Sequence, residues 1–225
     1  MTKTEIIKFL ILRTIGNFLV LFAIFGVLAT FGPALYYEAQ YRIIRMRGVR
    51  FLVENAPQKV NVPALGFSDV LSGPKEQILA PIDTVFNIII PKIGANARIF
   101  PNVDPSSPNI FLPILQKGVA HAKGTVFPGQ AGNIYLFAHS TDNFWDVGRY
   151  NAIFYLLKDL KEGDDIAVFY RNARHNYKVT RLGIISSREV SFITRAQTGK
   201  ELLILQTCWP PGTTWQRLLV LAEPK

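Results

Sequence analysis

The pattern of apolar and polar positions divides the chain into an apolar N-terminal run and a longer region of short strands. Residues 14–37 (TIGNFLVLFAIFGVLATFGPALYY) include no charged residue. About 20 apolar residues are enough to cross the hydrocarbon core of a bilayer. We therefore predict a transmembrane helix over residues 14–37, preceded by a short segment over residues 1–13. A buried core helix is the weaker alternative, because the run is apolar on all faces.

The next segment, residues 38–80, has weak periodicity and several Pro and Gly residues. Its first part, residues 42–50, is expected to continue the helix beyond the membrane. The rest is typical of a stalk or linker. We predict that the folded domain begins near Pro81 and covers residues 81–225.

Within this domain, six short runs are apolar or alternate between apolar and polar residues, and turn residues separate them. They are residues 85–90, 133–138, 165–170, 177–182, 202–207 and 218–221. Residues 152–160 (AIFYLLKDL) instead have helical spacing, and a second short helix is possible near residues 194–200. Many short strands and few helices predict an all-β fold with minor helices, built as a closed or nearly closed barrel.

The charge distribution indicates a membrane surface rather than nucleic acid as the partner. The chain has 25 basic and 16 acidic residues and a net charge of +9. Residues 1–50 hold seven basic and two acidic residues, a net charge of +5, and the remaining 175 residues hold a net charge of +4. The excess lies beside the apolar run, where anionic lipid is the simplest counterpart.

The single cysteine, Cys208, cannot form a disulfide within the chain. A lone cysteine is more often a buried structural residue than a reactive one. Its position favours reactivity, because Cys208 ends one strand-like run, His139 ends another, and Arg217 opens the last. A scaffold can hold a side chain rigidly at such a strand end while a substrate still reaches it.

Cys, His and Arg together suit acyl transfer. A thiolate is a strong nucleophile, and an imidazole can accept the thiol proton and later protonate a leaving amine. A fixed guanidinium can stabilise the negative charge that develops on the carbonyl oxygen. His121 is a second candidate base, whereas His175 lies in a polar segment that is typical of a hairpin tip.

Around these residues the sequence resembles the sortases. The family signature Thr-Leu-X-Thr-Cys corresponds to Ile204-Leu205-Gln206-Thr207-Cys208, and Arg217 follows nine residues later at the start of the next strand. The family's Gly-His pair corresponds to Ala138-His139. The segments PGQAGNIYLFAHS, FYLLKDLKEGDDIAVFY and IIIPKIGANARI are also similar to family patterns. The resemblance covers roughly residues 85–225.

The resemblance implies an eight-stranded β-barrel outside the cytoplasmic membrane, with the N-terminus inside and a single membrane pass. It implies a cysteine transpeptidase that cleaves a Leu-Pro-X-Thr-Gly-like motif near the C-terminus of secreted proteins. A thioacyl intermediate on Cys208 would then pass to an amine, either a peptidoglycan peptide or a pilin lysine. His139 is implied as acid and base and Arg217 as oxyanion stabiliser or clamp. Thr207 and Trp209 are implied to contact the substrate, and no metal or organic cofactor is required.

Two other classes of protein share part of this pattern. L,D-transpeptidases place a His two residues before the Cys with Gly between them, but Gln206-Thr207 precedes Cys208 here. A membrane-anchored domain that only binds peptides would not require Cys, His and Arg together. The residues leave open the preferred sorting motif, the acceptor amine, and the choice between surface anchoring and fibre assembly.

Overall fold

The computed structural model describes residues 3–54, 71–73, 76–140, 153–197, 199–211 and 213–225, apart from the side chains of residues 30–37. The chain separates into two compact units, Met1–Arg42 and Ile43–Lys225.

One long helix, α1 (Lys3–Met46), makes up the first unit and begins the second. Its stretch Lys3–Ala29 is long and apolar enough to cross a membrane, and none of its most apolar part is buried. The helix indicates a membrane anchor, since exposed apolar side chains over this length are costly in water. α1 extends beyond the predicted span of residues 14–37 and ends at Met46, inside the segment 42–50 that was expected to be helical.

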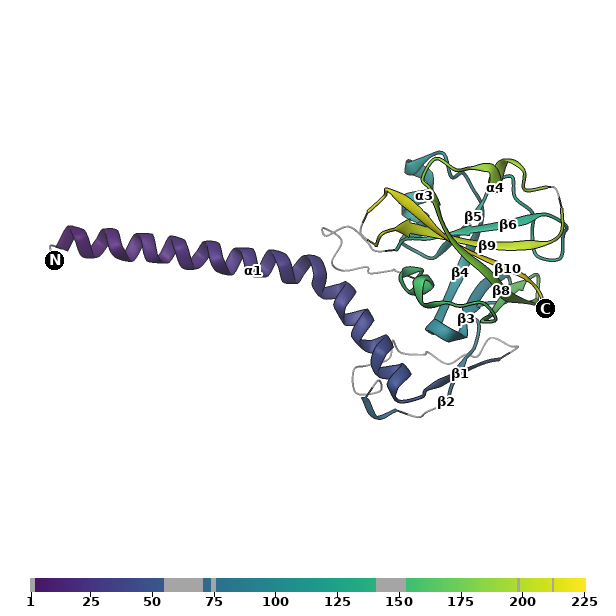
Figure 1. Ribbon diagram of the computed structural model, residues 1–225, viewed down its shortest axis with the longest axis horizontal. Coiled ribbons are helices and arrows are strands. Elements are labelled where there is room, and N and C mark those ends of the chain that lie inside the picture. The colour runs from purple at the N-terminus through teal and green to yellow at the C-terminus, as the bar shows by residue number, and fades with distance from the viewer. Residues whose placement is uncertain (1–2, 55–70, 74–75, 141–152, 198, 212) are drawn as a thin grey trace. The chain divides into compact units, whose positions relative to one another are not determined.

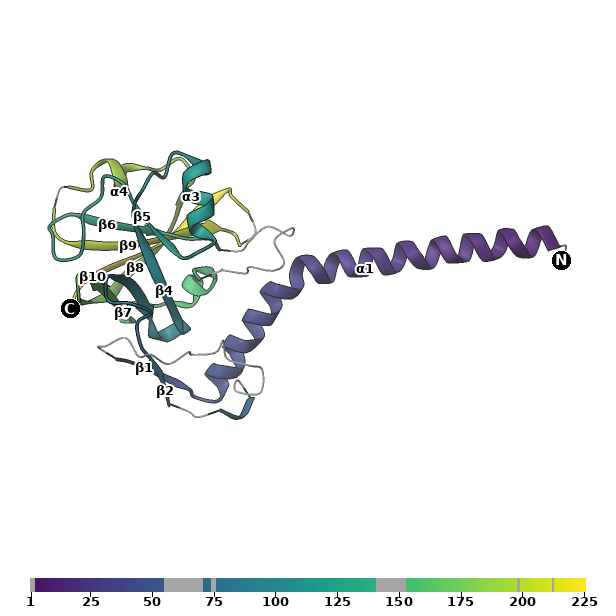
Figure 2. The same cartoon turned by 180° about the vertical axis from the view of Figure 1, so that it is seen from behind.

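Eight strands of the second unit form a closed barrel (Figures 1 and 2), in the order β10-β8-β7-β3-β4-β5-β6-β9. This confirms the predicted all-β barrel. Neighbours are antiparallel except for β4 with β5 and β6 with β9, which are parallel. The strands are β3 (Phe86–Ile90), β4 (Ala95–Val103), β5 (Val119–Ala122), β6 (Asn133–Phe137), β7 (Asp165–Tyr170), β8 (Ala173–Ser186), β9 (Leu202–Trp209) and β10 (Gln216–Pro224).

Regular structure outside the barrel is limited among the described residues. A parallel pair, β1 (Arg50–Val53) and β2 (Glu76–Leu79), lies within the segment predicted to be a linker. The short helices are η1 (Pro91–Ile93), α3 (Pro108–Leu115), η2 (Tyr155–Asp159) and α4 (Ser191–Thr194). The α-helix predicted at residues 152–160 is a short 3₁₀ helix, and residue 152 lies outside the described residues. The helix predicted near residues 194–200 was misplaced, because α4 ends at Thr194 and turns follow.

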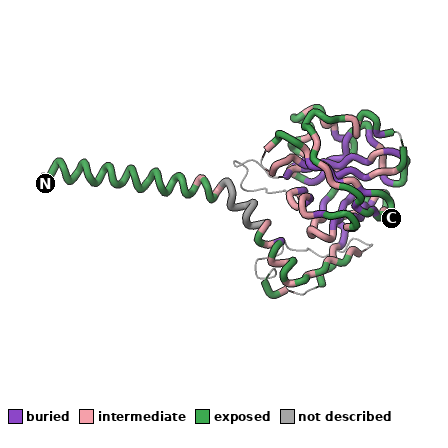
Figure 3. Tube along the Cα trace, in the orientation of Figure 1, coloured by how far each residue is buried: buried purple, intermediate pink, exposed green. Residues whose placement is uncertain are grey.

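Buried residues are concentrated in the barrel (Figure 3), where apolar side chains form two large groups and a small third group of Ile89, Ala167 and Phe169. The inner cluster takes residues from every strand of the barrel and from η2, including Ile88, Ile134, Leu136, Leu157, Leu203, Leu205 and Val220. The outer cluster lies against α3 and α4 and includes Tyr135, Phe137, Ile204, Leu219 and Leu115, with Phe192 and Ile193 packed on it. In β6 and β9 the two clusters take alternate residues, as the two faces of a strand require.

His121 on β5 is a buried polar residue with an exposed fraction of 0%. Its Nδ1 accepts the Asn102 N–H at 3.3 Å, and its Nε2 lies 3.0 Å from the Val126 carbonyl oxygen. The neutral ring therefore carries its hydrogen on Nε2. The ring also stacks on Phe127 with centroids 4.5 Å apart. Burial lowers the pKa of His121 below 6.5, and the hydrogen bond to Val126 opposes this in part.

Gly132, just before β6, has a backbone conformation and a close neighbour that a side chain would not fit. Its φ is +125°, and a Cβ would overlap the Ala196 carbonyl oxygen. We predict that Gly132→Ala lowers the free energy of unfolding by roughly 3 kcal/mol. Gly163→Ala is the matched control, because Gly163 has φ +89° but open space around it, and it should cost only about 1 kcal/mol. Equal losses in denaturant unfolding of the detergent-solubilised chain would contradict the crowding argument.

The environment of His121 predicts that acid weakens the fold. The lowered pKa means that the unfolded chain binds more protons than the folded chain as the pH falls below 6.5. Stability is therefore fully present above that pH and decreases below it, by at most about 1.4 kcal/mol per pH unit for this one proton. The measurement is the free energy of unfolding as a function of pH, and His121→Gln should flatten the profile. Controls with His175→Gln or His139→Gln should keep the decline, and an unchanged profile in His121→Gln would refute the assignment.

Candidate active site

Cys208 and Arg217 lie directly opposite each other on adjacent strands. β9 and β10 are antiparallel, and their register pairs Cys208 with Arg217 and Thr207 with Leu218. Directly opposed residues on one face have Cβ atoms about 5 Å apart. Both residues are half-buried. The structure therefore brings together two of the three residues that the sequence singled out for chemistry.

His139 joins this row from the other side of β9. β6 and β9 are parallel and pair Phe137 with Gln206. Beyond that pair, the Ala138 N–H donates to the Gln206 carbonyl at 3.2 Å, and the Thr207 hydroxyl donates to the Ala138 carbonyl at 3.1 Å. Extending this register by one residue predicts that His139 lies beside Cys208. The predicted row His139–Cys208–Arg217 crosses the adjoining ends of three neighbouring chain segments.

Strand alternation puts the three residues on one face. Ile204, four residues before Cys208, belongs to the outer cluster, as do Leu219 on β10 and Phe137 on β6. Cys208 and Arg217 are each an even number of residues from these positions, so they share the outer face. The same alternation, continued past the end of β6, predicts the outer face for His139. The inner face of β9 instead presents Leu203 and Leu205 to the inner cluster.

Thr207 and Trp209, the predicted substrate contacts, alternate to the other face of β9. Thr207 is only 2% exposed, and its hydroxyl is bound to the Ala138 carbonyl. Trp209 packs, partly buried, against the inner cluster. A contact of either side chain with a substrate stays a prediction. The observed contact of Thr207 is structural, because it joins the chain just before His139 to the chain just before Cys208.

The side chain of Arg217 is held by the loop that precedes it. Its Nη1 donates to the carbonyl oxygens of Thr214 at 3.0 Å and Gln216 at 2.9 Å. Among the described residues, Nε and Nη2 have no hydrogen-bond partner. The guanidinium is therefore fixed through one nitrogen while other donors remain available beside Cys208. A donor fixed before the reaction stabilises developing negative charge without a cost of reorganisation.

A polar group that the sequence analysis left without a role lies in the same region. The Tyr135 hydroxyl on β6 donates to Gln206 Oε1 on β9 at 2.9 Å. Burial is the main reason that the pKa of Tyr135 is raised, and the charges of Arg217 and Glu189 also act on it. Gln206 is two residues before Cys208, so strand parity could have placed it on the face of the thiol from sequence alone.

The other histidines do not replace His139. His121 is fully buried on β5, and its ring nitrogens are bound to Asn102, Val126 and Thr125. His175 lies on β8, where it pairs with Val168 of β7, and β10 lies between β8 and β9 in the barrel order. His121 was the second-ranked base, and its burial and neutral hydrogen-bonded state leave it without access to a substrate.

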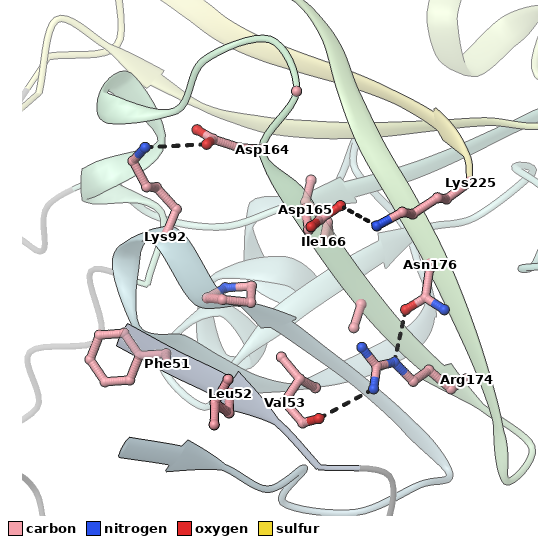
Figure 4. A pocket seen from close by; sticks show the side chains of 13 residues that line it. Phe51, Leu52, Val53, Lys92, Asp164, Asp165, Ile166, Arg174, Asn176 and Lys225 are labelled. Atoms are coloured by element: carbon pink, nitrogen blue, oxygen red, sulfur yellow. Dashed lines mark hydrogen bonds and ion pairs between the residues drawn. The ribbon is translucent and has the colours of Figure 1, made fainter. Parts of the chain in front are cut away.

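A cavity of about 380 Å³ lies elsewhere in the second unit, between β1 and the β7–β8 hairpin (Figure 4). Its charged side chains bind one another or nearby oxygens. Lys92 pairs with Asp164 at 3.2 Å and Lys225 with Asp165 at 3.3 Å, and Arg174 donates to the Val53 carbonyl. None of the predicted site residues lines this cavity. Its contacts connect β1 to the barrel, and we assign the candidate chemistry to the Cys208 row.

The described residues contain no group of three His, Cys, Asp or Glu side chains that could hold a metal ion. What the row offers is a thiol between an imidazole and a guanidinium. These groups can supply a nucleophile, a proton acceptor and donor, and a stabiliser for an oxyanion. The arrangement suits transfer of an acyl group from one amine to another.

Comparison with known proteins agrees with this chemistry. The model of the family described as the sortase domain matches residues 88–225. Over 121 residues the chain is 31% identical to sortase D of Bacillus subtilis (strain 168), which covers 54% of this chain. The match spans 52%, or about half, of the length of that relative.

Solved structures extend the likeness to the fold. The crystal structure of sortase C-1 from Actinomyces oris is 28% identical, with a TM-score of 0.53 over 64% of this chain and 76% of that one. The X-ray structure of Clostridium perfringens sortase C with the C-terminal cell wall sorting motif is 27% identical, with a TM-score of 0.50 over 62% and 69% of the two chains. With the barrel and the Cys208 row on the matched segment, the chain belongs to the sortase family.

Proposed function

We propose that the protein is a membrane-anchored cysteine transpeptidase that cleaves a sorting motif and transfers the acyl part to an amine. The observation that carries the proposal is that Cys208 lies opposite Arg217 across β9 and β10. The parallel register of β6 and β9, which brings the chain before His139 alongside the chain before Cys208, supports His139 as the third member. The substrate is a secreted protein with a Leu-Pro-X-Thr-Gly-like motif near its C-terminus. The acceptor is an amine at the cell surface.

In the first half-reaction, the Cys208 thiolate attacks the carbonyl carbon of the motif's Thr. Negative charge develops on the carbonyl oxygen, and the remaining donors of Arg217 stabilise it. The bond to the following residue then breaks, and protonated His139 gives its proton to the leaving amine. The products are a thioester on Cys208 and a free C-terminal fragment.

In the second half-reaction, an incoming amine replaces the thiolate. His139 accepts the proton that the amine loses as it attacks the thioester carbonyl. The carbonyl passes again through an oxyanion beside Arg217, and the C–S bond breaks to release the Cys208 thiolate. One amide bond has been exchanged for another, so no oxidant, cofactor or external energy source is required.

The environment implied by this reaction agrees with α1. An apolar helix at the N-terminus holds the catalytic unit near the membrane that secreted substrates cross. We place the N-terminus inside and the barrel outside the cell, with lipid around Lys3–Ala29. The solved Clostridium perfringens sortase C, which was determined with a cell wall sorting motif, supports a substrate of this class.

The first test is trapping of the thioacyl intermediate. Detergent-solubilised protein is incubated with sorting-motif peptides and without an amine acceptor, and the intact mass is measured. We expect an adduct of the upstream peptide fragment that maps to Cys208, because the thioester persists until an amine or water resolves it. Cys208→Ala should give neither adduct nor cleavage. A folded wild type that binds the peptides but never cleaves them would favour the peptide-binding alternative.

The second test assigns the other two members of the row. His139→Ala should lower kcat by roughly 10²–10⁴-fold, because proton transfer to the leaving amine is lost. Arg217→Ala should lower kcat by roughly 10²–10³-fold through loss of oxyanion stabilisation. His175→Ala and Arg181→Ala are matched controls on β8 and should retain normal turnover. Near wild-type kcat in either site variant, with an unchanged unfolding curve, removes that residue from the mechanism.

A further inference from the structure

We propose that Gln206 is a substrate-binding residue, whose side-chain amide donates a hydrogen bond to a backbone carbonyl of the bound peptide upstream of the scissile bond. The proposal rests on the proposed transpeptidase function and refines it. It follows from the position of Gln206, from its fixed orientation and from the donor that it leaves available.

Gln206 shares the face of Cys208. It lies two residues before the nucleophile on β9, at a separation of about 6.7 Å along the strand. Its neighbours across the sheet are Phe137 on β6 and Leu219 on β10, both buried members of the outer cluster. Gln206 is therefore a partly exposed polar side chain between two apolar neighbours, next to the thiol.

Tyr135 fixes which end of the Gln206 amide is presented. The Tyr135 hydroxyl donates to Oε1 at 2.9 Å, and Tyr135 as a residue is 2% exposed. Burial keeps the pKa of Tyr135 above its ordinary value, so the hydroxyl remains a donor at physiological pH. Because Oε1 accepts from Tyr135, the two N–H groups on Nε2 must point elsewhere.

Those N–H groups are the available donors. Among the described residues, Nε2 has no hydrogen-bond partner. The atom is accessible to solvent rather than buried. Water can therefore satisfy it before a peptide binds. A peptide that covers Gln206 beside Cys208 displaces this water. The peptide must then offer a hydrogen-bond acceptor, since an unpaired donor away from water is unfavourable. Backbone carbonyls are the acceptors that every extended peptide carries at regular spacing.

The separation from Cys208 indicates which carbonyl is involved. An extended peptide advances about 3.3 Å per residue, so 6.7 Å corresponds to two residues. The recognised part of a sorting motif lies upstream of its cleaved bond. The partner of Gln206 is therefore the carbonyl two residues upstream of the scissile carbonyl.

The test combines Gln206→Leu with peptides in which one amide is replaced by an ester, which weakens the carbonyl as an acceptor. The full detergent-solubilised chain is assayed with a series that moves the ester along the motif on both sides of the cleaved bond. In the wild type, the ester two residues upstream should lower kcat/KM by about tenfold, mainly through KM. Gln206→Leu should lower kcat/KM of the all-amide peptide by a similar factor and should no longer respond to that ester.

Two variants control for indirect effects. Tyr135→Phe removes only the hydroxyl that orients the amide and should raise KM by less than Gln206→Leu does. Gln77→Leu makes the same change on β2, away from the row, and should behave as the wild type. The rate of Cys208 alkylation by iodoacetamide should be equal in all four proteins, because the thiol itself is not altered.

Different outcomes separate the two proposals. If the wild type forms no thioacyl adduct with any motif, the proposed function fails. If the wild type turns over normally and Gln206→Leu shows the same kcat/KM and the same ester profile, the role of Gln206 is refuted. If the ester lowers kcat/KM equally in the wild type and in Gln206→Leu, the carbonyl is bound by another donor. That outcome also overturns the proposal.

Discussion

The site depends on the parallel pairing of β6 with β9 and on the bond that extends it. These strands are separated in sequence by β7, β8 and α4, yet they are neighbours in the barrel. A parallel pair cannot be joined by a tight hairpin, so a long crossover is required. The Thr207 hydroxyl then carries the contact one residue past the last strand pair, onto the Ala138 carbonyl. Without this extension, the chain could diverge just where His139 must lie beside Cys208.

The alternation of side chains along β9 places residues that stabilise the fold on one face and the candidate catalytic residue on the other. On β9, odd positions from Leu203 to Trp209 face the inner cluster or the Ala138 backbone, and even positions from Ile204 to Cys208 face outward. The outer face is covered by α3 and α4 around Ile204 and becomes more open toward Cys208. β9 therefore carries the buried Thr207, which binds the Ala138 carbonyl, and the half-buried thiol of Cys208 on consecutive residues. A shift of register by one residue would exchange the two sets.

Much of the barrel could be predicted from sequence, because β3, β6, β7 and β9 are dense in apolar residues. β4 was missed because Asn96, Arg98 and Pro101 interrupt its pattern, and β5 because four residues give no periodicity. The short 3₁₀ helix η2 has apolar spacing similar to that of an α-helix, so the two are hard to distinguish. The choice of Cys208, His139 and Arg217 came from strand ends together with the family resemblance. The side-by-side register could not be obtained that way, because strand order in a barrel is a long-range property.

The donors around Cys208 also constrain what the site can bind. On the β10 side, Arg217 is fixed by loop carbonyls and keeps other N–H groups available. On the same strand as the thiol, Gln206 is oriented by Tyr135 and also presents N–H groups. Both arrangements use an acceptor or hydroxyl of the protein to fix one end of a side chain and leave hydrogen-bond donors at the other end. A surface that presents fixed donors beside apolar side chains suits a chain that is rich in hydrogen-bond acceptors. An extended peptide backbone has that character, and its carbonyls can be bound in register with the strand that carries the nucleophile.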